Sequence, residues 1–210
     1  ERMYYFRWWT YRKHVKKTPD GWVITEFLPQ VPWSGKHNTI SCPAGHHFYE
    51  GRWLRDRRYM NDYAVFWFRK GGSPRRYSFW AANAIYGDFL VRQNRKLVVD
   101  LLDDLVANYN GWERSRLTSD GLFWQIDDRD GMEVSVGGSG KRATINSYMY
   151  GDAYWHLPWE TWTYDVGGDQ WKCILHVPLP EIRRGYGPNF SNPPKGWPWG
   201  DSKNIWPMAV

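Results

Sequence analysis

Residues 120–153 read DGLFWQIDDRDGMEVSVGGSGKRATINSYMYGDA, and their pattern sets the expectations for the rest of the chain. Asp120-Gly121 indicates a turn, and the apolar run at 122–126 predicts an extended segment that enters a core. After a glycine-rich part, Thr144 predicts the N-cap of a helix. One face of that helix repeats at i, i+3, i+4 and i+7 through Ile145, Tyr148, Met149 and Asp152. The stretch therefore predicts an acidic loop held between two elements that bury aromatic side chains.

The acidic loop places Asp127, Asp128, Asp130 and Glu133 within seven residues, interrupted by Arg129. Crowded carboxylates repel one another, so we expect one raised pKa beside groups that stay ionised, as acid–base catalysis requires. A solvated acidic turn, a salt-bridge cluster around Arg129 and a calcium site are the other interpretations of the same residues. The spacing does not follow an EF-hand loop, so we predict no metal here.

The segments before this stretch predict helices joined by long connections. We expect helices at residues 3–15, 59–69, 73–89 and 98–112, an extended run at 22–28, and an irregular Pro- and Gly-rich loop at 29–51. Ser73-Pro74 predicts the start of the third helix, because Ser suits the N-cap and Pro the first turn. A break at 94–96 separates two apolar stripes, which predicts an antiparallel helical hairpin. We assign these stripes no chemistry.

The composition changes after Ala153. Residues 154–210 contain 8 of the 13 Pro and 7 of the 16 Trp, and Pro interrupts helices. We therefore expect a helical domain at 1–153 and an irregular tail at 154–210 whose one strand-like run is 171–177. Two explanations of the tail remain open: an unusual extension, or coding sequence read in a shifted frame.

Composition and charge narrow the function classes. Aromatic residues make up 19% of the chain, and their flat faces suit sugar rings, although an aromatic-rich core explains the same number. The net charge of +6 would attract polyanions, yet no nucleic-acid-binding motif is present and basic residues are mixed with acidic ones. No apolar run approaches 18 residues, so we expect no membrane span. Two cysteines, Cys42 and Cys173, are too few for a disulfide framework.

A zinc site is the remaining metal interpretation. The predicted loop at 29–51 contains His37, Cys42, His46, His47 and Glu50. Adjacent histidines on an extended segment point apart, and no second Cys or His pair lies nearby in the sequence. We therefore expect neither a metal nor another cofactor.

Several of these segments resemble a known family. The runs DGMEVSVGGSG and TINSYMYGDA are similar to the catalytic segment of six-hairpin glycoside hydrolases, which include trehalases, glycoside hydrolase family 63 and the mannosylglycerate-hydrolase-like enzymes. Residues 4–29, 42–68 and 71–86 resemble the mannosylglycerate-hydrolase-like branch, so the resemblance covers about residues 4–153. It implies a mainly α fold, a partial (α/α)6 toroid of helical hairpins with long irregular loops and minor β structure.

The resemblance also implies site residues. The family's Ser-Gly-(aromatic or Met)-Asp motif, which contains the general acid, corresponds to Asp130-Gly131-Met132-Glu133, with Glu in place of the final Asp. Glu133 is thus the first candidate for the acid and Asp130 the reserve, while Asp127 and Asp128 would bind sugar hydroxyls and Arg129 would tune their ionisation. Further contacts to substrate are expected from Arg7, Trp8, His46, His47, Glu50, Arg52, Trp53, Trp124 and Asn146.

Two functions follow from these expectations. The first is a glycoside hydrolase-like domain acting on an α-linked sugar by inversion, with the base on a later hairpin that no segment of this chain resembles. The second is a non-catalytic carbohydrate-binding module in which Trp8, Trp53 and Trp124 stack on sugars. We expect a carbohydrate partner, no nucleic acid and no membrane. A half-built core would also leave apolar helix faces exposed and favour self-association.

Overall fold

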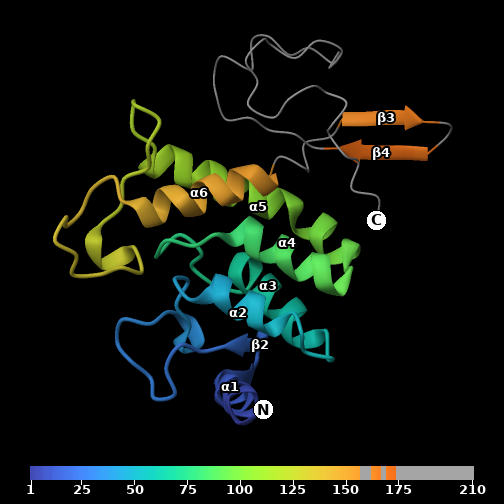
Figure 1. Cartoon of the computed structure of the whole chain (residues 1–210), viewed down its shortest axis with the longest axis vertical. Helices are drawn as coiled ribbons and strands as arrows, with labels where there is room; N and C mark the ends of the chain where they lie inside the picture. Colours follow the sequence, from blue (N-terminus) through green and yellow to red (C-terminus); the bar gives the residue numbers. More distant parts are fainter. Residues whose placement is uncertain (157–161, 167–168, 174–210) are drawn as a thin grey trace.

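Helices dominate the computed structural model, which describes residues 1–156, 162–166 and 169–173 (Figure 1). The helices are α1 (Arg2–His14), α2 (Ala44–Gly51), α3 (Arg58–Arg69), α4 (Ala81–Arg92), α5 (Arg95–Arg116) and α6 (Ala143–His156), with short 3-10 turns at Lys36–Asn38 and Asp127–Arg129. Strands β1 (Val15–Thr18) and β2 (Gly21–Ile24) form one antiparallel hairpin, and β3 (Trp162–Val166) and β4 (Asp169–Cys173) form another. The prediction of a mainly α fold with minor β structure is confirmed.

The helices from α2 to α6 pack as a series. Helix α4 contacts α2 on one side and α6 on the other, α5 packs on both α4 and α6, and α3 packs on β2 (Figure 1). The main core lies among α2, α3, α4 and the start of α5, and its largest buried side chains include Phe48, Tyr63, Trp67 and Phe79. A smaller cluster joins Trp112 and Phe123 to Ile145 and Met149. This second cluster holds the acidic loop between α5 and α6.

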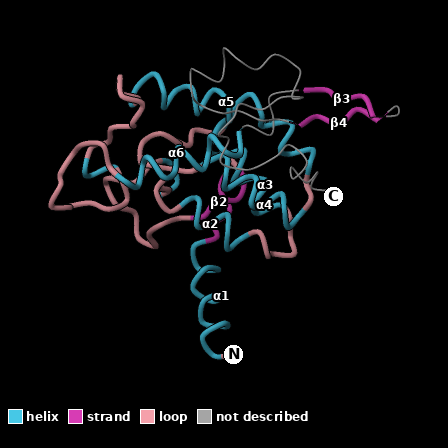
Figure 2. Tube along the Cα trace, turned by 45° about the horizontal axis from the view of Figure 1, so that its top comes forward, coloured by secondary structure: helices cyan, strands magenta, loops and turns pink. Residues whose placement is uncertain are grey.

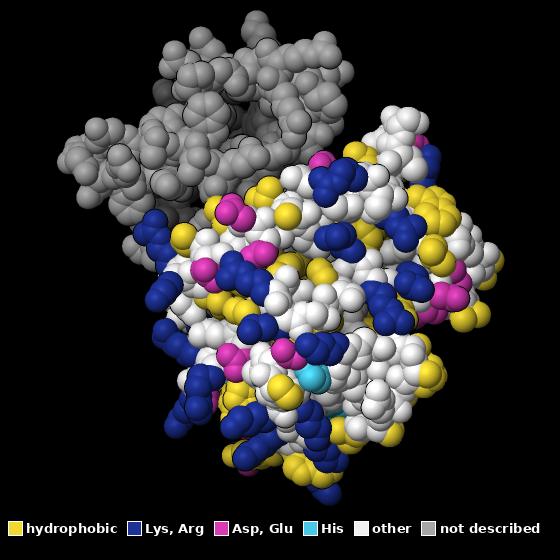
Figure 3. All heavy atoms as spheres, turned by 180° about the vertical axis from the view of Figure 1, so that it is seen from behind, with side chains coloured by type: hydrophobic (Ala, Val, Ile, Leu, Met, Phe, Trp, Pro, Cys, Tyr) yellow, Lys and Arg dark blue, Asp and Glu magenta, His cyan; other side chains and the backbone are white. Residues whose placement is uncertain are grey.

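Helix α1 projects from this body (Figure 2). None of its residues is buried. It exposes a run of large apolar side chains: Met3, Tyr4, Tyr5, Phe6 and Trp9. Basic side chains share that end of the molecule, and elsewhere on the same face they lie among acidic and apolar ones (Figure 3).

The predicted hairpin of helices is present as α4 and α5. Gln93 adopts a left-handed conformation with φ 53°, and the Asn94 side chain accepts a hydrogen bond from the Leu97 backbone N–H at 3.4 Å. These residues end one helix and cap the next. Four members of the predicted second stripe are buried: Val98, Leu101, Leu105 and Trp112. The spacing of apolar residues therefore predicted this unit correctly.

Three boundaries differ from the sequence expectation. Helix α2 forms inside the predicted loop, because its small residues Gly45 and Gly51 let α2 pack closely against other side chains. The helix expected to begin at Ser73 is α4 and begins at Ala81. The backbone N–H groups of residues 77 and 78, before it, donate instead to Ser41 Oγ and to the Arg129 carbonyl. Thr144 lies in the first turn of α6 and is not its cap. In each case tertiary contacts outweigh local signals.

Only residues 154–156, 162–166 and 169–173 of the tail belong to the described part of the chain. Strand β4 overlaps the start of the predicted run at 171–177, whose remaining residues lie outside the described part of the chain. None of the described helices is both long and apolar enough to cross a membrane.

Candidate functional site

The acidic loop folds around Arg142, an arginine that the sequence analysis did not single out. Its guanidinium pairs with Asp127 and Asp130, and Nε donates to Asp130 Oδ2 at 2.6 Å. It also donates to Ser135 Oγ at 2.7 Å and to two backbone carbonyls of the loop. Arg129 instead donates to a backbone carbonyl and lies near the ring of Tyr77. The loop is therefore shaped by Arg142, because a guanidinium can serve several acceptors at once.

Asp130 is fully buried at the centre of this network. Its Oδ1 accepts a hydrogen bond from Ser78 Oγ at 2.7 Å, and Ser78 Oγ accepts one from Gln125 Nε2 at 3.2 Å. The hydrogen bond to Asp130 is the main reason that the pKa of Arg142 lies above its ordinary value. Asp130 thus anchors the loop, and a role for it in proton transfer stays a prediction.

The pKa of Asp127 is lowered, contrary to the shift that crowding would produce. Burial acts to raise this pKa, but hydrogen bonds from Ser135 and the charge of Arg142 outweigh it. Ser135 Oγ donates to Asp127 Oδ1 at 3.0 Å. An opposite charge and donated hydrogen bonds favour the ionised carboxylate. Asp127 is therefore held as an anion by its partners in the loop.

Glu133 is exposed on the same loop and lies within electrostatic range of Cys42. The pKa of the Cys42 thiol rises to about 12, first through burial and then through the charges of Glu133, Glu26 and Asp130. Val134, directly after Glu133, has φ 58°, which is unfavourable for a β-branched residue. Such strain is found most often at functional positions. Glu133 is thus presented on a strained segment within electrostatic range of a half-buried thiol.

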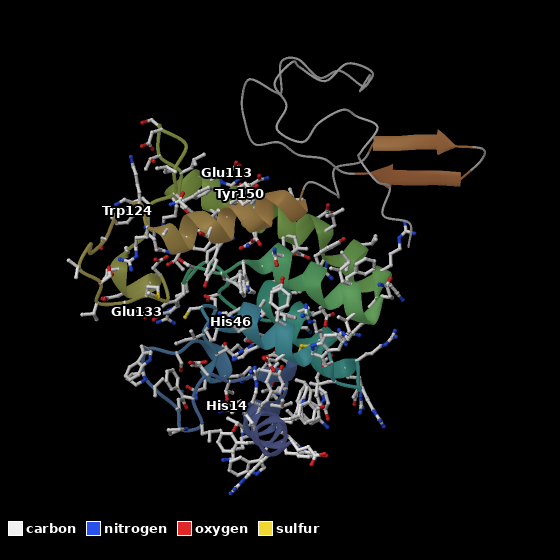
Figure 4. The ribbon with its side chains drawn as sticks, viewed as in Figure 1. His14, His46, Glu113, Trp124, Glu133 and Tyr150 are labelled. Atoms are coloured by element: carbon white, nitrogen blue, oxygen red, sulfur yellow. The ribbon has the colours of Figure 1, made fainter. Side chains whose placement is uncertain are left out.

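Three rings pack around Trp80, and we call the group of His46, Tyr49, Trp80 and Tyr148 the aromatic floor. The Trp80 ring centre lies 4.8 Å from that of His46, 5.5 Å from Tyr49 and 4.9 Å from Tyr148. Helices α2 and α6 provide the other three rings, and Trp80 immediately precedes α4. In Figure 4 His46 and Glu133 lie on the same side of the body, with Glu133 on the loop.

Two further carboxyl groups near the floor have raised pKa values. Burial raises the pKa of Glu26, although the charges of His14 and His46 lower it. Burial also raises the pKa of Asp152 to about 7, although backbone N–H groups of residues 81–83 donate to it. Asp152 Oδ1 accepts from the Asn83 N–H at 3.0 Å, while the buried Oδ2 has no partner. Both of these carboxyl groups with a raised pKa thus lie outside the acidic loop.

Two of the predicted contact residues on α2, Glu50 and His47, contact α1. Glu50 makes an ion pair with Arg7, and the His47 carbonyl accepts a hydrogen bond from Tyr11 Oη at 2.8 Å. His47 Nδ1 lies 3.0 Å from Tyr63 Oη, and its Nε2 lies 3.8 Å from Glu26 Oε2. Burial lowers the pKa of His47 to about 3, so its imidazole is neutral.

Three aromatic candidates are spread over the surface. Trp8 is half-buried with its ring centre 5.8 Å from that of Tyr11, and Trp53 is 60% exposed with Arg52 5.3 Å from its ring centre. Trp124 lies across the loop region from Glu133 in Figure 4, and its ring is near Arg116. These three rings do not belong to the aromatic floor.

The last two candidates differ in role. Asn146 Nδ2 donates to the carbonyls of Phe123 and Arg142 at 2.9 and 2.8 Å, and its Oδ1 accepts from the Phe123 N–H at 2.9 Å. It therefore fixes the segment before the acidic loop to α6. Asp128 is exposed on the loop.

Sequence reasoning missed Trp80, Tyr49, Arg142 and Glu26. The apolar stripe predicted for the helix at 73–89 includes Phe79 and Ala82 but not Trp80, which lies between them. The helical pattern therefore gave no reason to expect Trp80 on the packed face. One signal was available for Arg142, because it lies two residues before the predicted N-cap Thr144 and follows four acidic residues. The described residues contain no group of three or more His, Cys, Asp and Glu placed to hold a metal ion.

Comparisons with known proteins bear on the family and the fold. A family model described as "Mannosylglycerate hydrolase MGH1-like glycoside hydrolase domain" matches residues 36–142. A solved structure named "Sialidase" is similar at 43% sequence identity and a TM-score of 0.70 over 74% of this chain, and this chain spans 15% of that chain's length. No curated protein matches significantly. The matched region contains both the acidic loop and most of the aromatic floor, and the chain belongs to the MGH1-like glycoside hydrolase domain family.

Proposed function

We propose that this glycoside hydrolase domain acts on an α-linked sugar with inversion, and that Glu133 is the general acid. The state of the loop carboxylates supports this assignment: Asp127 and Asp130 are paired with Arg142, whereas Glu133 is exposed on the same loop. A general acid must reach the leaving oxygen, which the exposed Glu133 carboxyl group can do, whereas Asp130 is fully buried with both of its oxygens engaged by Ser78 and Arg142. Asp127 and Asp130 then serve to hold the loop that presents Glu133.

Inversion requires a second carboxylate, about 6.5–9.5 Å from the acid, that activates water. The resemblance to six-hairpin enzymes implies that this base lies on a later hairpin. Protonation of the leaving group and attack by water then occur on opposite faces of the sugar ring. This chain spans 15% of the length of the similar structure named "Sialidase". Any activity of a longer protein that contains this domain is therefore a proposal.

Hydrolysis of aryl α-glycosides tests the acid, measured with this domain joined to the later hairpin that provides the base and with the Glu133→Gln variant of the same protein. We expect turnover of glycosides with poor leaving groups to fall by about 10²- to 10⁴-fold. The leaving group of a 2,4-dinitrophenyl α-glycoside is 2,4-dinitrophenolate, which departs without protonation. The Glu133→Gln variant should therefore hydrolyse this substrate nearly as fast as the parent does. Glu113→Gln is the matched control, because Glu113 lies on α5 away from the loop (Figure 4).

Each result has a definite meaning. Equal losses on both kinds of leaving group would contradict the acid role of Glu133. NMR of the first-formed sugar would show the β anomer for inversion, and an α anomer would refute that part of the proposal.

A non-catalytic carbohydrate-binding module is the second candidate. The exposed ring of Trp53 favours it, because exposed aromatic rings are suited to stacking on sugars. This function predicts sugar binding without turnover on any glycoside, and binding that Glu133→Gln leaves unchanged.

A further inference from the structure

The backbone of Arg142 is fixed at the point where α6 begins. Its carbonyl oxygen accepts hydrogen bonds from the Asn146 backbone N–H at 3.3 Å and from Asn146 Nδ2 at 2.8 Å. The same Asn146 side chain holds the backbone of Phe123, which belongs to the buried cluster between α5 and α6. The Arg142 side chain therefore enters the acidic loop from a well-anchored part of the chain, which favours precise placement of what it holds.

The guanidinium of Arg142 contacts the loop on both sides of Glu133. Nη2 donates to the Met132 carbonyl, directly before Glu133, and Nη1 donates to Ser135 Oγ at 2.7 Å, two residues after it. Glu133 and Val134 lie between these two contacts, and both are exposed. Arg142 thus joins the two ends of the short segment that presents the Glu133 carboxyl group.

This short segment has a backbone conformation that needs external support. Val134 has φ 58°, and a strained residue of this kind persists only where the surrounding structure holds it. The next residue, Ser135, donates to Asp127 Oδ1 through its backbone N–H at 3.3 Å and its hydroxyl at 3.0 Å. Asp127 is itself paired with Arg142. Loss of the guanidinium would therefore weaken the support on which the conformation around Glu133 depends.

A further bond of Arg142 ties the loop to the body of the domain. Its Nε donates to Asp130 Oδ2 at 2.6 Å, and Asp130 Oδ1 accepts from Ser78 Oγ at 2.7 Å. The Ser78 backbone N–H in turn donates to the carbonyl of Arg129, in the loop, at 2.8 Å. Arg142 therefore connects the segment around Glu133 with a buried carboxylate that is bonded to the residues before α4.

These contacts require the geometry of an arginine. A guanidinium is a rigid planar group whose N–H donors point in several fixed directions, whereas an ammonium is a compact charge on a flexible stem. Arg142 uses Nε, Nη1 and Nη2 toward different partners at the same time. Lysine at this position could keep a charge beside Asp127 and Asp130, but it could not hold residues 132 and 135 in the same arrangement.

We propose, on the basis of the general-acid role proposed above for Glu133, that Arg142 is the positioning residue that sets the place of this carboxyl group. The Arg142 side chain is 9% exposed and engaged within the loop, so it acts through its partners and not on the sugar. It holds the backbone at Met132 and the side chain of Ser135, and the Glu133 carboxyl group then meets the leaving oxygen in one orientation. A misplacement of about 1 Å can cost about 10²-fold in rate.

Kinetics of Arg142→Gln and Arg142→Lys test this proposal in the same protein that tests Glu133→Gln. For a glycoside with a poor leaving group, we expect kcat to fall about 10²-fold in Arg142→Gln and about tenfold in Arg142→Lys, with KM changed less than about threefold. The 2,4-dinitrophenyl glycoside needs no acid, so both variants should hydrolyse it within about threefold of the parent. Lys141→Gln is the matched control, because this neighbouring cation pairs with Asp120.

A double variant tests whether Arg142 acts through Glu133. Because both changes remove the same proton transfer, Arg142→Gln combined with Glu133→Gln should be slower than Glu133→Gln alone by less than about threefold. Losses that multiply in the double variant would overturn the proposal.

A milder variant keeps the proposal testable if Arg142→Gln does not fold, since that change leaves the buried Asp130 without its cation. Ser135→Ala removes the side-chain contact after Glu133 and keeps both ion pairs of Arg142. Its kcat on the poor leaving group should fall about three- to tenfold, again with little change on the dinitrophenyl substrate. Ser139→Ala is the matched control, because the Ser139 hydroxyl accepts from the Asp127 N–H at 3.1 Å on the same loop.

Millisecond hydrogen exchange followed by mass spectrometry gives a measurement that does not depend on turnover. In Arg142→Lys, exchange of the backbone amides at 131–136 should become about fivefold faster or more, because local opening costs less free energy. Peptides from α3 and α4 should exchange as in the parent, which shows that the variant is folded.

The outcomes separate this inference from the proposed function. Unchanged exchange at 131–136 in Arg142→Lys would overturn the inference whatever the role of Glu133. Equal losses of kcat on both leaving groups in folded Arg142→Lys would also overturn it, because that pattern indicates a structural role alone. Equal losses in Glu133→Gln would instead overturn the proposed function and, with it, the catalytic part of this inference. Leaving-group selectivity shared by Glu133→Gln, Arg142→Lys and Ser135→Ala would support both.

Discussion

A buried ion pair in α4 gives the sharpest test of the energetics of this fold. Arg92 Nε and Nη2 each donate to Asp88 at 2.7 Å, and both side chains are less than 5% exposed. Arg92 also donates to the carbonyl of Arg57 at 2.9 Å and to Asn61 Oδ1 at 3.0 Å, which ties α4 to the start of α3. The pKa of Asp88 is raised, because burial outweighs the hydrogen bonds and charge of Arg92.

We expect Arg92→Met to lower the free energy of unfolding by about 3–5 kcal/mol. The variant keeps an apolar side chain in place but leaves a buried carboxylate without its partner, which is the costly way to break such a pair. Two acceptors on α3 also lose a donor. Because Asp88 can take up a proton instead, the loss should shrink by as much as about 1.4 kcal/mol for each pH unit below 7.

Urea unfolding followed by tryptophan fluorescence and circular dichroism at pH 5 to 8 measures this effect. Arg69→Met is the matched control: Arg69 pairs with Asp100 and Asp104 on the surface, so its loss should cost less than about 1 kcal/mol. Replacing both Asp88 and Arg92 by apolar residues should recover much of the stability. An Arg92→Met variant no less stable than Arg69→Met, or a loss that does not change with pH, would refute the reasoning.

Two further predictions concern α6. Asp152 has a pKa of about 7 in the folded chain, so between pH 4 and 7 the folded state keeps a proton that the unfolded state has lost, and the free energy of unfolding falls by about 4 kcal/mol as pH rises. The lowered pKa of His47 changes the free energy of unfolding in the opposite direction, so thermal melts must compare the parent with Asp152→Asn at each pH. A stability difference between the two proteins that stays constant with pH would contradict the prediction. Asn146→Ala should destabilise the chain by about 1–3 kcal/mol and speed proteolytic cleavage of the acidic loop, because three hydrogen bonds are lost. Ser147→Ala, an exposed neighbour, should have little effect in either assay, and equal cleavage rates would show that Asn146 does not hold the loop.

Helical periodicity predicted the parts of the fold in which one face is buried along several turns. Helices α5 and α6 follow their predicted stripes, and Asn94 ends the hairpin turn as a cap. Helix α2 was missed because Pro43 and its glycines are signals of a loop. Its two glycines are instead points of close packing, and only a neighbouring element reveals that purpose.

The candidate site was predictable in its acidic loop but not in its partners. The sequence placed Glu133 and its neighbours on an irregular segment, and the structure agrees. It did not show that Arg142, fifteen residues after Asp127, folds back to pair with it. It also did not show that Trp80 meets rings from α2 and α6, since such contacts join residues more than thirty positions apart.

The sequence by itself determined the mainly helical class, the α4–α5 hairpin, the acidic loop and the family. These properties depend on local spacing, because the period of apolar residues and the turn-forming residues act over a few positions. The tertiary structure decided which carboxylates are neutralised, which are buried and which rings form the aromatic floor. Those properties depend on charge and burial at close range, and distances between remote segments are set only when the helices pack.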